Sequence, residues 1–344
     1  MLMVGGGATM LSIRELRDRA VIRPIKRAVE DQLLDLPGVT AVDIGEKRTS
    51  GRSTGQQVIV VSVANKLPAD RLASELQVPA DILGIPTDVI EETPVLHHLH
   101  AGVDQPAPPM QRRTDRIGGV RAGGGIAPHR SVQLAPPFVP ATGEYRRIGT
   151  LGLLVTGNGP ASVTMGLTTF DVACLDDAWS VGDRMIDPDL DEVYADLARA
   201  ALSGRVDAAA VSLGPGVHHR GAIDGIGPVG GQRGAYPGEV VRKSGYATGL
   251  TSGIVTSIDT TLRVDHGDAL GVRILREQMR ITTTAARFAG AGDAGAALID
   301  STGYVVGLHI AGSGDGETGF ASPIADVLAE LDVELYTESE RLEV

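Results

Sequence analysis

The chain has one cysteine, few aromatic residues and fewer basic than acidic side chains. A lone thiol, Cys174, cannot form a disulfide within the chain and fits a reducing compartment, so we expect a cytoplasmic protein. Aromatic residues make up 3% of the 344 residues, and the formal net charge is −12. Because nucleic acids and anionic membranes repel such a surface, we expect neither of them as a partner.

A long apolar run is also missing. The N-terminal stretch MLMVGGGATMLSIRELRDRA is apolar only briefly and has no basic segment before it, so we expect no signal peptide. No run approaches the length needed to cross a bilayer. Glycine and proline are abundant instead, at 45 and 19 residues. Such a composition is typical of short strands joined by tight turns and favours a β-rich fold.

The first 95 residues predict a small α/β domain (1–95). Residues 12–36 place apolar side chains at helical spacing among charges. GVTAVDIGEK and QQVIVVSVANK predict a strand pair, PADRLASEL a short helix and IPTDVIEET a further strand.

A proline-rich linker is predicted at 96–116, and it contains three histidines, His97, His98 and His100. Their proximity suggests a metal site, but zinc needs three or four converging ligands and no cysteine or carboxylate cluster accompanies them. We therefore expect a solvated or interface histidine cluster, with a metal as the alternative.

From residue 117 the pattern changes to short apolar runs separated by glycine. One series of strand candidates covers 117–220 and a second covers 221–344, with a stretch of loop-forming residues at 214–238 between them. The segment IADVLAELDVEL then predicts an amphipathic helix followed by a last strand. Two strand series of similar length predict two packed β-barrels.

Several segments, in order, resemble trypsin-like (chymotrypsin-fold) serine peptidases of the bacterial and plant narrow-leaf-type branch. VRKSGYATGLTSGIVTSID resembles the opening hairpin of the second barrel, and AGAGDAGAALIDSTGYVVGLHIAG is similar to the nucleophile segment. LTTFDVA resembles the end of the histidine-bearing segment, and RVDAAAV the segment of the acidic triad member. The resemblance covers about 117–335 and implies a mainly β fold with two six-stranded-type barrels and a C-terminal helix. The N-terminal unit also resembles the small domain that precedes such peptidases.

The resemblance places two catalytic positions on residues that lack the required chemistry. Ala294 stands at the nucleophile position and Asp171 at the histidine position, whereas Asp207 retains the triad carboxylate. The oxyanion hole would consist of the backbone N–H groups of Gly292 and Ala294, which survive any change of side chain. The implied protein could bind a carbonyl or a peptide without cutting it.

We therefore expect a catalytically inactive pseudoprotease that acts as a protein-binding or assembly module. A protein or peptide would occupy the former substrate groove, the α/β domain would mediate self-association, and no cofactor or metal is expected. One alternative is a serine endopeptidase whose nucleophile has been replaced by alanine. Another is a structural subunit of a homo-oligomer.

Asp171 and Asp207 raise a separate expectation. With no imidazole between them, the two carboxylates would lie close together, so one pKa should rise or a cation should bind. Asp171 could instead cap a turn or face water. A carboxyl pair acting as a general acid and base, with His218, His219 or His309 nearby, is a further alternative.

Three other features have ordinary interpretations. The stretch 187–196 (DPDLDEVYAD) spaces its carboxylates like a calcium loop but lacks the glycine and the distal glutamate, which favours an exposed acidic loop. The stretch 121–127 (RAGGGIA) is not followed by a helix pattern, which favours strand and turn over a dinucleotide site. Cys174 has no histidine in its local sequence, so we expect a small buried thiol.

Overall fold

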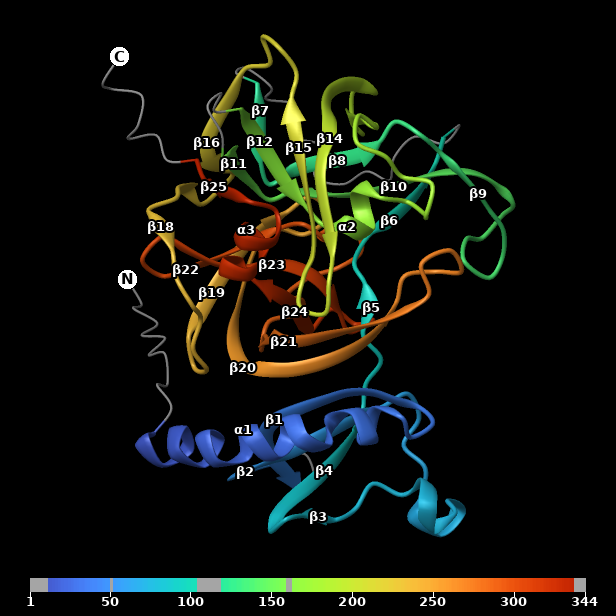
Figure 1. Ribbon diagram of the computed structural model, residues 1–344, viewed down its shortest axis with the longest axis vertical. Coiled ribbons are helices and arrows are strands. Elements are labelled where there is room, and N and C mark those ends of the chain that lie inside the picture. Colours follow the sequence, from blue (N-terminus) through green and yellow to red (C-terminus); the bar gives the residue numbers. More distant parts are fainter. Residues whose placement is uncertain (1–11, 50–51, 104–118, 159–162, 337–344) are drawn as a thin grey trace.

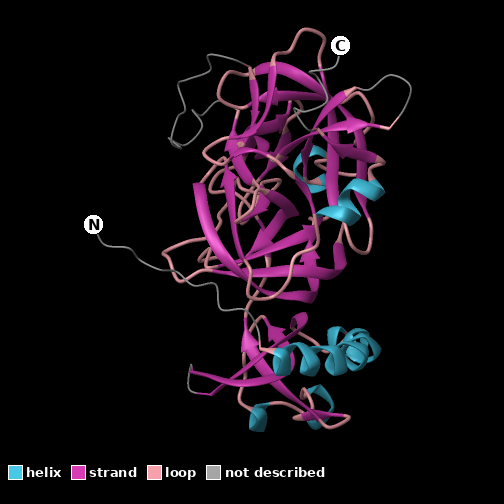
Figure 2. Ribbon diagram, turned by 90° about the vertical axis from the view of Figure 1, so that its left-hand side faces the viewer, coloured by secondary structure: helices cyan, strands magenta, loops and turns pink. Residues whose placement is uncertain are grey.

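The computed structural model describes residues 12–49, 52–103, 119–158 and 163–336. A small unit of one helix and a few strands lies at one end of the molecule, and a larger β-rich body forms the rest (Figure 1). Figure 2 shows the longest helix beside the small sheet at that end. The mainly β fold with a small N-terminal α/β domain and a C-terminal helix is confirmed.

The N-terminal unit forms around helix α1 (Ile13–Leu34). A capping box begins the helix, because the Ser12 side chain accepts from the Glu15 amide at 3.2 Å and the Glu15 carboxylate accepts from the Ser12 amide at 2.6 Å. The helix packs on the antiparallel strands β1 (Val39–Thr49) and β2 (Arg52–Val63). Their buried apolar side chains form one cluster: Ile22, Leu33, Leu34, Val39, Val42, Ile44, Ile59 and Val61.

Two further strands complete this unit. Strand β4 (Ile85–Glu91) runs parallel to β2, and the short β3 (Asp81–Ile82) pairs with β4. The predicted helix in PADRLASEL is replaced by two 3₁₀ turns, Ala69–Arg71 and Ser74–Leu76. Ala73, between them, has ψ near 146°, which is an extended conformation that a continuous helix cannot contain.

The N-terminal unit is attached to the larger body through a shared sheet. Strand β1 pairs with β20 (Gly249–Asp265) at Ala41–Leu262 and Val42–Thr261. Beside this ladder the Arg280 guanidinium contacts the Asp43 carboxylate at 3.0 Å and the Glu92 carboxylate at 2.9 Å. The contact between the two parts is therefore both a backbone ladder and a group of largely buried charges.

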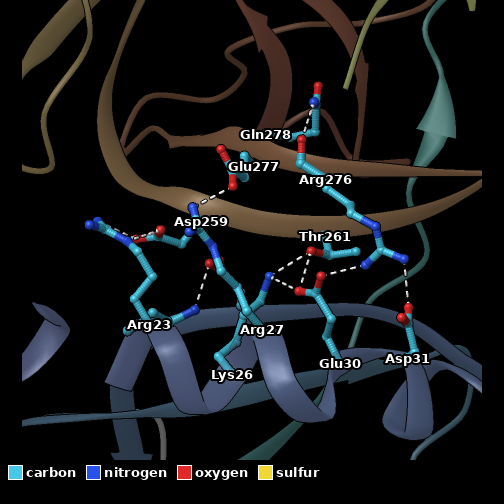
Figure 3. Close-up of polar contacts among 12 residues, drawn as sticks. Arg23, Lys26, Arg27, Glu30, Asp31, Asp259, Thr261, Arg276, Glu277 and Gln278 are labelled. Carbon is cyan, nitrogen blue, oxygen red and sulfur yellow. Dashed lines mark hydrogen bonds and ion pairs between the residues drawn. The ribbon is translucent and has the colours of Figure 1, made fainter. Parts of the chain in front are cut away.

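Charged side chains of α1 also face β20 and β21 (Val272–Thr282), as Figure 3 shows. Arg23 pairs with Asp259, and Arg27 pairs with Glu277. The buried Lys26 ammonium lies 2.5 Å from the Thr261 hydroxyl. A cavity of about 330 Å³ lies here, lined by Lys26, Arg27, Glu30, Asp31, Asp259, Arg276 and Glu277. Lys26 also pairs with Glu30 of the same helix, so each of these three cations has an acidic partner, and two of the ion pairs join the helix to the barrel.

The second barrel is a closed antiparallel ring. Its strands follow the order β19, β20, β21, β24, β23 and β22, and β22 pairs again with β19. The bounds not yet given are Val240–Gly245 for β19, Ala297–Asp300 for β22, Tyr304–Gly312 for β23 and Thr318–Pro323 for β24. Apolar side chains fill its interior: Val241, Val255, Met279, Ile281, Phe288, Leu298, Val306 and Ala321.

The first barrel closes through a strand that is interrupted at Gly152. Strands β10 (Gly143–Leu151) and β11 (Leu153–Gly157) are separated by this residue alone. The ring runs β10, β8, β13, β14, β15, β12 and β11. The other bounds are Gly124–Pro128 for β8, Thr164–Thr168 for β12, Arg184–Asp187 for β13, Glu192–Leu202 for β14 and Asp207–Leu213 for β15.

The C-terminal segment returns to the first barrel. Helix α3 (Ile324–Glu330) follows β24, and strand β25 (Val333–Leu335) then pairs with β11. Helix and strand agree with the prediction from IADVLAELDVEL. No helix in the described part of the chain combines the length and hydropathy that a bilayer crossing requires.

Short strands occur where the sequence indicated linker or loop. Strand β5 (Val95–Leu96) pairs with β23, and β6 (Leu99–Gly102) pairs with β10, so residues 95–102 run from the second barrel to the first. The rest of the expected linker, 104–116, lies outside the described residues.

In the expected break between the two strand series, β16 (His219–Ile223) runs parallel to β7 (Val120–Ala122) and pairs with β17 (Gly227–Pro228). The remaining short strands are β9 (Val132–Leu134) on β10 and β18 (Gly231–Gln232) on β23.

Candidate functional site

The turn at residues 290–295, between β21 and β22, is held by the Asp293 carboxylate. Lys243 donates to this carboxylate at 2.8 Å, the Thr248 hydroxyl at 2.6 Å and the Gly290 amide at 3.0 Å. The other carboxylate oxygen accepts from the Ala247 and Thr248 amides at 3.0 and 3.1 Å. Burial alone would raise the pKa of Asp293, but the Lys243 ammonium outweighs it and holds that pKa below its usual value.

Strand β10 of the first barrel fixes the same turn from the other side. The Thr150 amide donates to the Ala294 carbonyl at 2.7 Å, and the Thr150 hydroxyl donates to the Gly292 carbonyl at 2.9 Å. Gly295 has φ of +98°, and a Cβ there would lie 2.1 Å from the Thr150 carbonyl oxygen. The sequence therefore needs glycine at 295 both for the backbone conformation and for the approach of the two barrels.

The amides of Gly292 and Ala294 converge on one oxygen atom. Both donate to the carbonyl oxygen of His97, at 2.7 Å and 3.1 Å. Two backbone donors directed at one carbonyl oxygen form the arrangement that stabilises an oxyanion in acyl-transfer enzymes. We call these two N–H groups the cradle. Its occupant is part of this same chain, and Ala294 beneath it is fully buried.

Asp171 lies in the short helix α2 (Phe170–Ala173) and is 1% exposed. One carboxylate oxygen accepts from Arg147 at 2.9 Å, and the other lies 2.6 Å from Nδ1 of His98. Burial favours the neutral acid, but His98 and Arg147 outweigh it and hold the pKa of Asp171 well below its usual value. The expectation that Asp171 faces water is wrong. So is a raised pKa at this carboxyl, because Arg147 supplies the cation.

Asp207, at the start of β15, has its own partners. One carboxylate oxygen accepts from the Asp171 amide at 3.1 Å, and the other lies 2.8 Å from Nε2 of His266. Burial disfavours charge on His266, but Asp207 outweighs it and raises the pKa of this imidazole. The two carboxylates thus contact separate cationic or imidazole groups. They do not form the proton-sharing pair considered from the sequence.

The histidines at 97 and 98 are parts of the site. We expected a solvated or interface cluster, and the solvated alternative is wrong for His97, which is 3% exposed. Its Nδ1 lies 2.9 Å from Nε2 of His309. The rings of His98 and His100 meet edge to face at 4.6 Å. Burial lowers the pKa of His100 to about 4, and His98 and Arg147 add to the effect.

His218 and His219 lie elsewhere. His219 is at the start of β16, where Nδ1 lies 3.2 Å from the Val217 carbonyl oxygen and the ring meets Tyr336. Over the described residues no group of three or more histidine, cysteine or carboxylate side chains could hold a metal ion.

Sequence reasoning missed Arg147, His266 and the role of His97. Their contacts with Asp171, Asp207 and His309 span 24, 59 and 212 positions along the chain. Neither spacing nor periodicity carries that information. The only available signal was the three closely spaced histidines, which by themselves indicate a surface cluster.

The remaining sequence features are structural. Asp187 is buried at the end of β13, where its carboxylate accepts from the Asp189 and Leu190 amides, and residues 192–196 belong to β14. The expected exposed acidic loop is therefore only a short turn. The stretch 121–127 forms β7, a turn at Gly123 and β8, as predicted. Cys174 is fully buried, as predicted, and burial raises the pKa of its thiol.

Comparison with known proteins gives structural likeness only. No protein-family model matches the chain, and no curated protein matches it. Among solved structures, a glutamic-acid-specific serine protease that uses a histidine triad in substrate binding is similar, at 19% identity and a TM-score of 0.47, over 63% of this chain and 100% of that one. Protease A of Thermobifida fusca is similar at 21% identity and a TM-score of 0.45, over 63% and 98%. The Rv3671c protease of M. tuberculosis follows at 20% identity and 0.36, over 60% and 79%. At such identities the likeness concerns at most the fold.

Proposed function

We propose that this chain is a catalytically inactive trypsin-like protein that holds a peptide segment in its former active site instead of cleaving it. The observation that carries the proposal is the pair of hydrogen bonds from the Gly292 and Ala294 amides to one peptide carbonyl. These donors bind a carbonyl whatever the neighbouring side chains are. The proposed role is that of a binding or assembly module.

The side chains around the cradle support inactivity. Acyl transfer by this type of site needs a nucleophilic hydroxyl and an imidazole that accepts its proton. Ala294 has no nucleophilic atom. Asp171 is an ion-paired carboxylate whose pKa is well below its usual value, and a base of so low a pKa has little driving force to remove a proton at neutral pH.

The site also argues against a peptidase in which only the nucleophile has been replaced. Such a replacement would leave an imidazole at position 171, whereas Asp171 is matched by the Arg147 guanidinium at 2.9 Å. Self-association as a homo-oligomer, a protein or peptide partner bound from another molecule, and a cytoplasmic location remain proposals. The last rests on the single cysteine of the sequence.

The test is a peptidase assay on the purified chain, with casein and a mixture of fluorogenic peptides. We expect no turnover from the natural chain, since loss of nucleophile or base costs on the order of a millionfold in such enzymes. The variant Asp171→Asn and a matched control at the partly exposed Asp176, Asp176→Asn, should be equally inactive. Turnover by the natural chain that disappears in Asp171→Asn but persists in Asp176→Asn would overturn the proposal.

A positive arm uses the double variant Ala294→Ser/Asp171→His. If the cradle is a former oxyanion hole, the new hydroxyl lies beside the His97 carbonyl, and reaction with a fluorophosphonate probe should increase once residues 95–98 are replaced by a Gly-Ser segment. The same Gly-Ser replacement in the natural chain should leave it unreactive. Labelling of Ala294→Ser/Asp171→His at a position other than 294, found by peptide mapping, would contradict the assignment of the site.

A further inference from the structure

Residues 95–102, which we call the strap, occupy the cradle as an extended peptide would. Leu96 pairs with Ala311 on β23, and the His97 amide donates to the Ile310 carbonyl at 3.2 Å. The His97 carbonyl then receives both cradle amides. Backbone pairing with a strand supplies binding that does not depend on sequence, and the side-chain pockets beside it supply selectivity. The side chain of His97 occupies such a pocket, so the surroundings of this ring indicate which side chain of a peptide the site would select.

That pocket is shaped for a planar side chain. A Cβ at Gly312 would lie 2.4 Å from Cε1 of the His97 ring, so glycine is needed for the ring to lie against this backbone. The His97 and His309 rings are 5.1 Å apart, and Phe288 meets His309 edge to face at 6.0 Å. His97 Nδ1 faces His309 Nε2 at 2.9 Å.

This contact requires imidazoles that are not both charged. One facing nitrogen must donate and the other must accept, and an imidazolium has only donors. A second proton on one ring places a charge among buried groups, and a second proton on both rings points two N–H groups at each other and removes the contact. Both side chains are buried, so water does not replace the lost partner.

The charged groups around the pair do not favour a proton there. Lys243 and His98 oppose charge on His97, and Lys243 also opposes charge on His309. Asp293 favours it, but this carboxylate is already bound to Lys243. Burial is the largest effect: it lowers the pKa of His97 to about 4, and it lowers the pKa of His309 well below its ordinary value.

We propose that the pocket beside the cradle is a site for an uncharged histidine side chain of a peptide, that the strap is its resident ligand, and that protonation of the His97–His309 pair releases the strap and opens the cradle. The inference rests on the proposed function, since an active peptidase would cut the bound segment. Release concerns the half of the strap that lies on the second barrel. The other half remains in place, because His98 contacts the Asp171 carboxylate and β6 pairs with β10.

The expected size of the effect follows from the depressed pKa. If His97 has its ordinary value of 6.5 when released and about 4 when bound, binding of the strap weakens as pH falls below 6.5. His97 alone gives a loss of about thirtyfold at pH 5 and about a hundredfold at pH 4, relative to pH 7.5. Protonation of His309 adds to this loss.

Hydrogen exchange of the full chain, followed by mass spectrometry and corrected for intrinsic rates, measures the release directly. The amides to follow are those of residues 290–296, because two of them donate to the strap. Strands β1 and β2 serve as the internal reference. Protection of residues 290–296 should fall by about thirtyfold or more between pH 7.5 and pH 5, while protection of the reference strands stays. No fall, or an equal fall in both regions, would overturn the inference.

Variants separate the histidine pair from other titrating groups. In His97→Gln/His309→Gln two uncharged amides face each other. If the histidine pair carries most of the pH dependence, protection of residues 290–296 should fall by less than about threefold between pH 7.5 and pH 5 in this variant. A matched control, His219→Gln, removes a histidine that lies away from the cradle and should behave as the natural chain. A fall of the natural size in His97→Gln/His309→Gln would refute the inference. If this variant does not fold, the single variant His97→Gln serves, with a fall smaller than in the natural chain.

The exchange experiment and the peptidase assay have separate readouts, so a failure of one can be told from a failure of the other. A peptidase assay at pH 5, where the strap is expected to be released, should still show no turnover. Turnover at pH 5 together with the exchange pattern above would refute inactivity and leave the acid release standing. Protection of residues 290–296 that does not change with pH, together with no turnover, would refute the acid release and leave inactivity standing.

Discussion

The buried pair of Lys243 and Asp293 offers a demanding test, because it holds the turn that carries the cradle. Both side chains are 0% exposed, and their charged atoms lie 2.8 Å apart. In Lys243→Met the Asp293 carboxylate keeps its amide donors but loses its cation inside the protein. Removing one partner of a buried ion pair costs about 3–5 kcal/mol, because the other charge is left uncompensated.

The loss should depend on pH with a definite sign. In the natural chain the folded pKa of Asp293 is lowered, so its stabilising contribution is complete at neutral pH and is lost only as pH falls below 3.8 through the folded value. In Lys243→Met burial is no longer outweighed, and we expect a raised pKa. Proton uptake by Asp293 then stabilises the folded variant. The free energy of unfolding of Lys243→Met should therefore lie closer to that of the natural chain at pH 5 than at pH 8.

Urea unfolding followed by circular dichroism at both pH values gives this deficit as a difference between variant and natural chain. Lys243 also opposes charge on His97 and His309, so the comparison is made in the His97→Gln/His309→Gln background, where the difference reports Asp293. A matched control is Arg130→Met, which breaks a pair at 2.8 Å whose side chains are 41% and 28% exposed, and it should cost at most about 1 kcal/mol. A deficit of Lys243→Met no larger than that of the control, or one that is equal at both pH values, would refute the reasoning.

Three further outcomes are expected. Arg280→Met should destabilise the contact between the N-terminal unit and the second barrel by about 3 kcal/mol, because the largely buried carboxylates of Asp43 and Glu92 lose their cation. This loss should appear as faster hydrogen exchange in β1 and β2 than in β14 and β15. Cys174 should not react with a thiol reagent in the native protein and should react fully in denaturant, because it is buried and burial raises the pKa of its thiol; rapid labelling of the native chain would contradict this. Gly295→Ala should lower the thermal midpoint by several degrees, because its Cβ would lie 2.1 Å from the Thr150 carbonyl oxygen, whereas Gly204→Ala, with open space around it, should change it little.

The two barrels could be predicted because each strand leaves its own local mark. Short apolar runs bounded by glycine correspond to the strands of both rings, and the helical spacing near the C-terminus corresponds to α3. The N-terminal helix likewise begins at the residue where a serine and a glutamate form a capping box. In these cases the signal and the structure lie within the same dozen residues.

The strap could not be predicted from its own sequence. Its pairing strands are only two and four residues long, and they gain their conformation from β23 and β10. A proline-rich neighbourhood and three histidines indicated a linker with a solvated or interface histidine cluster. Their burial depends on a pocket that Gly312 and His309 complete, more than 200 positions further along the chain.

The charges of the site were predicted only in part for the same reason. The sequence showed two aspartates at positions that the resemblance brings together, and like charges at short range predict a raised pKa. The structure adds a guanidinium from β10 and an imidazole from the segment after β20, and each carboxylate accepts from one of them. A prediction from negative groups alone therefore had the wrong sign for Asp171.

The guanidinium and the imidazole also bear on the proposal that the site is inactive. An imidazole at position 171 would lie close to the Arg147 guanidinium, which opposes the imidazolium that must form when a serine is deprotonated. The second carboxylate, Asp207, already has an imidazole partner, because one of its oxygens contacts His266 and the other accepts from the Asp171 amide. Ala294→Ser alone, with Asp171 in place, would supply a nucleophile without an imidazole base, in a place that the strap covers. Both oxygens of the Asp171 carboxylate have a partner, one in Arg147 and one in His98, and this supports the proposal of a site that binds a peptide without cutting it.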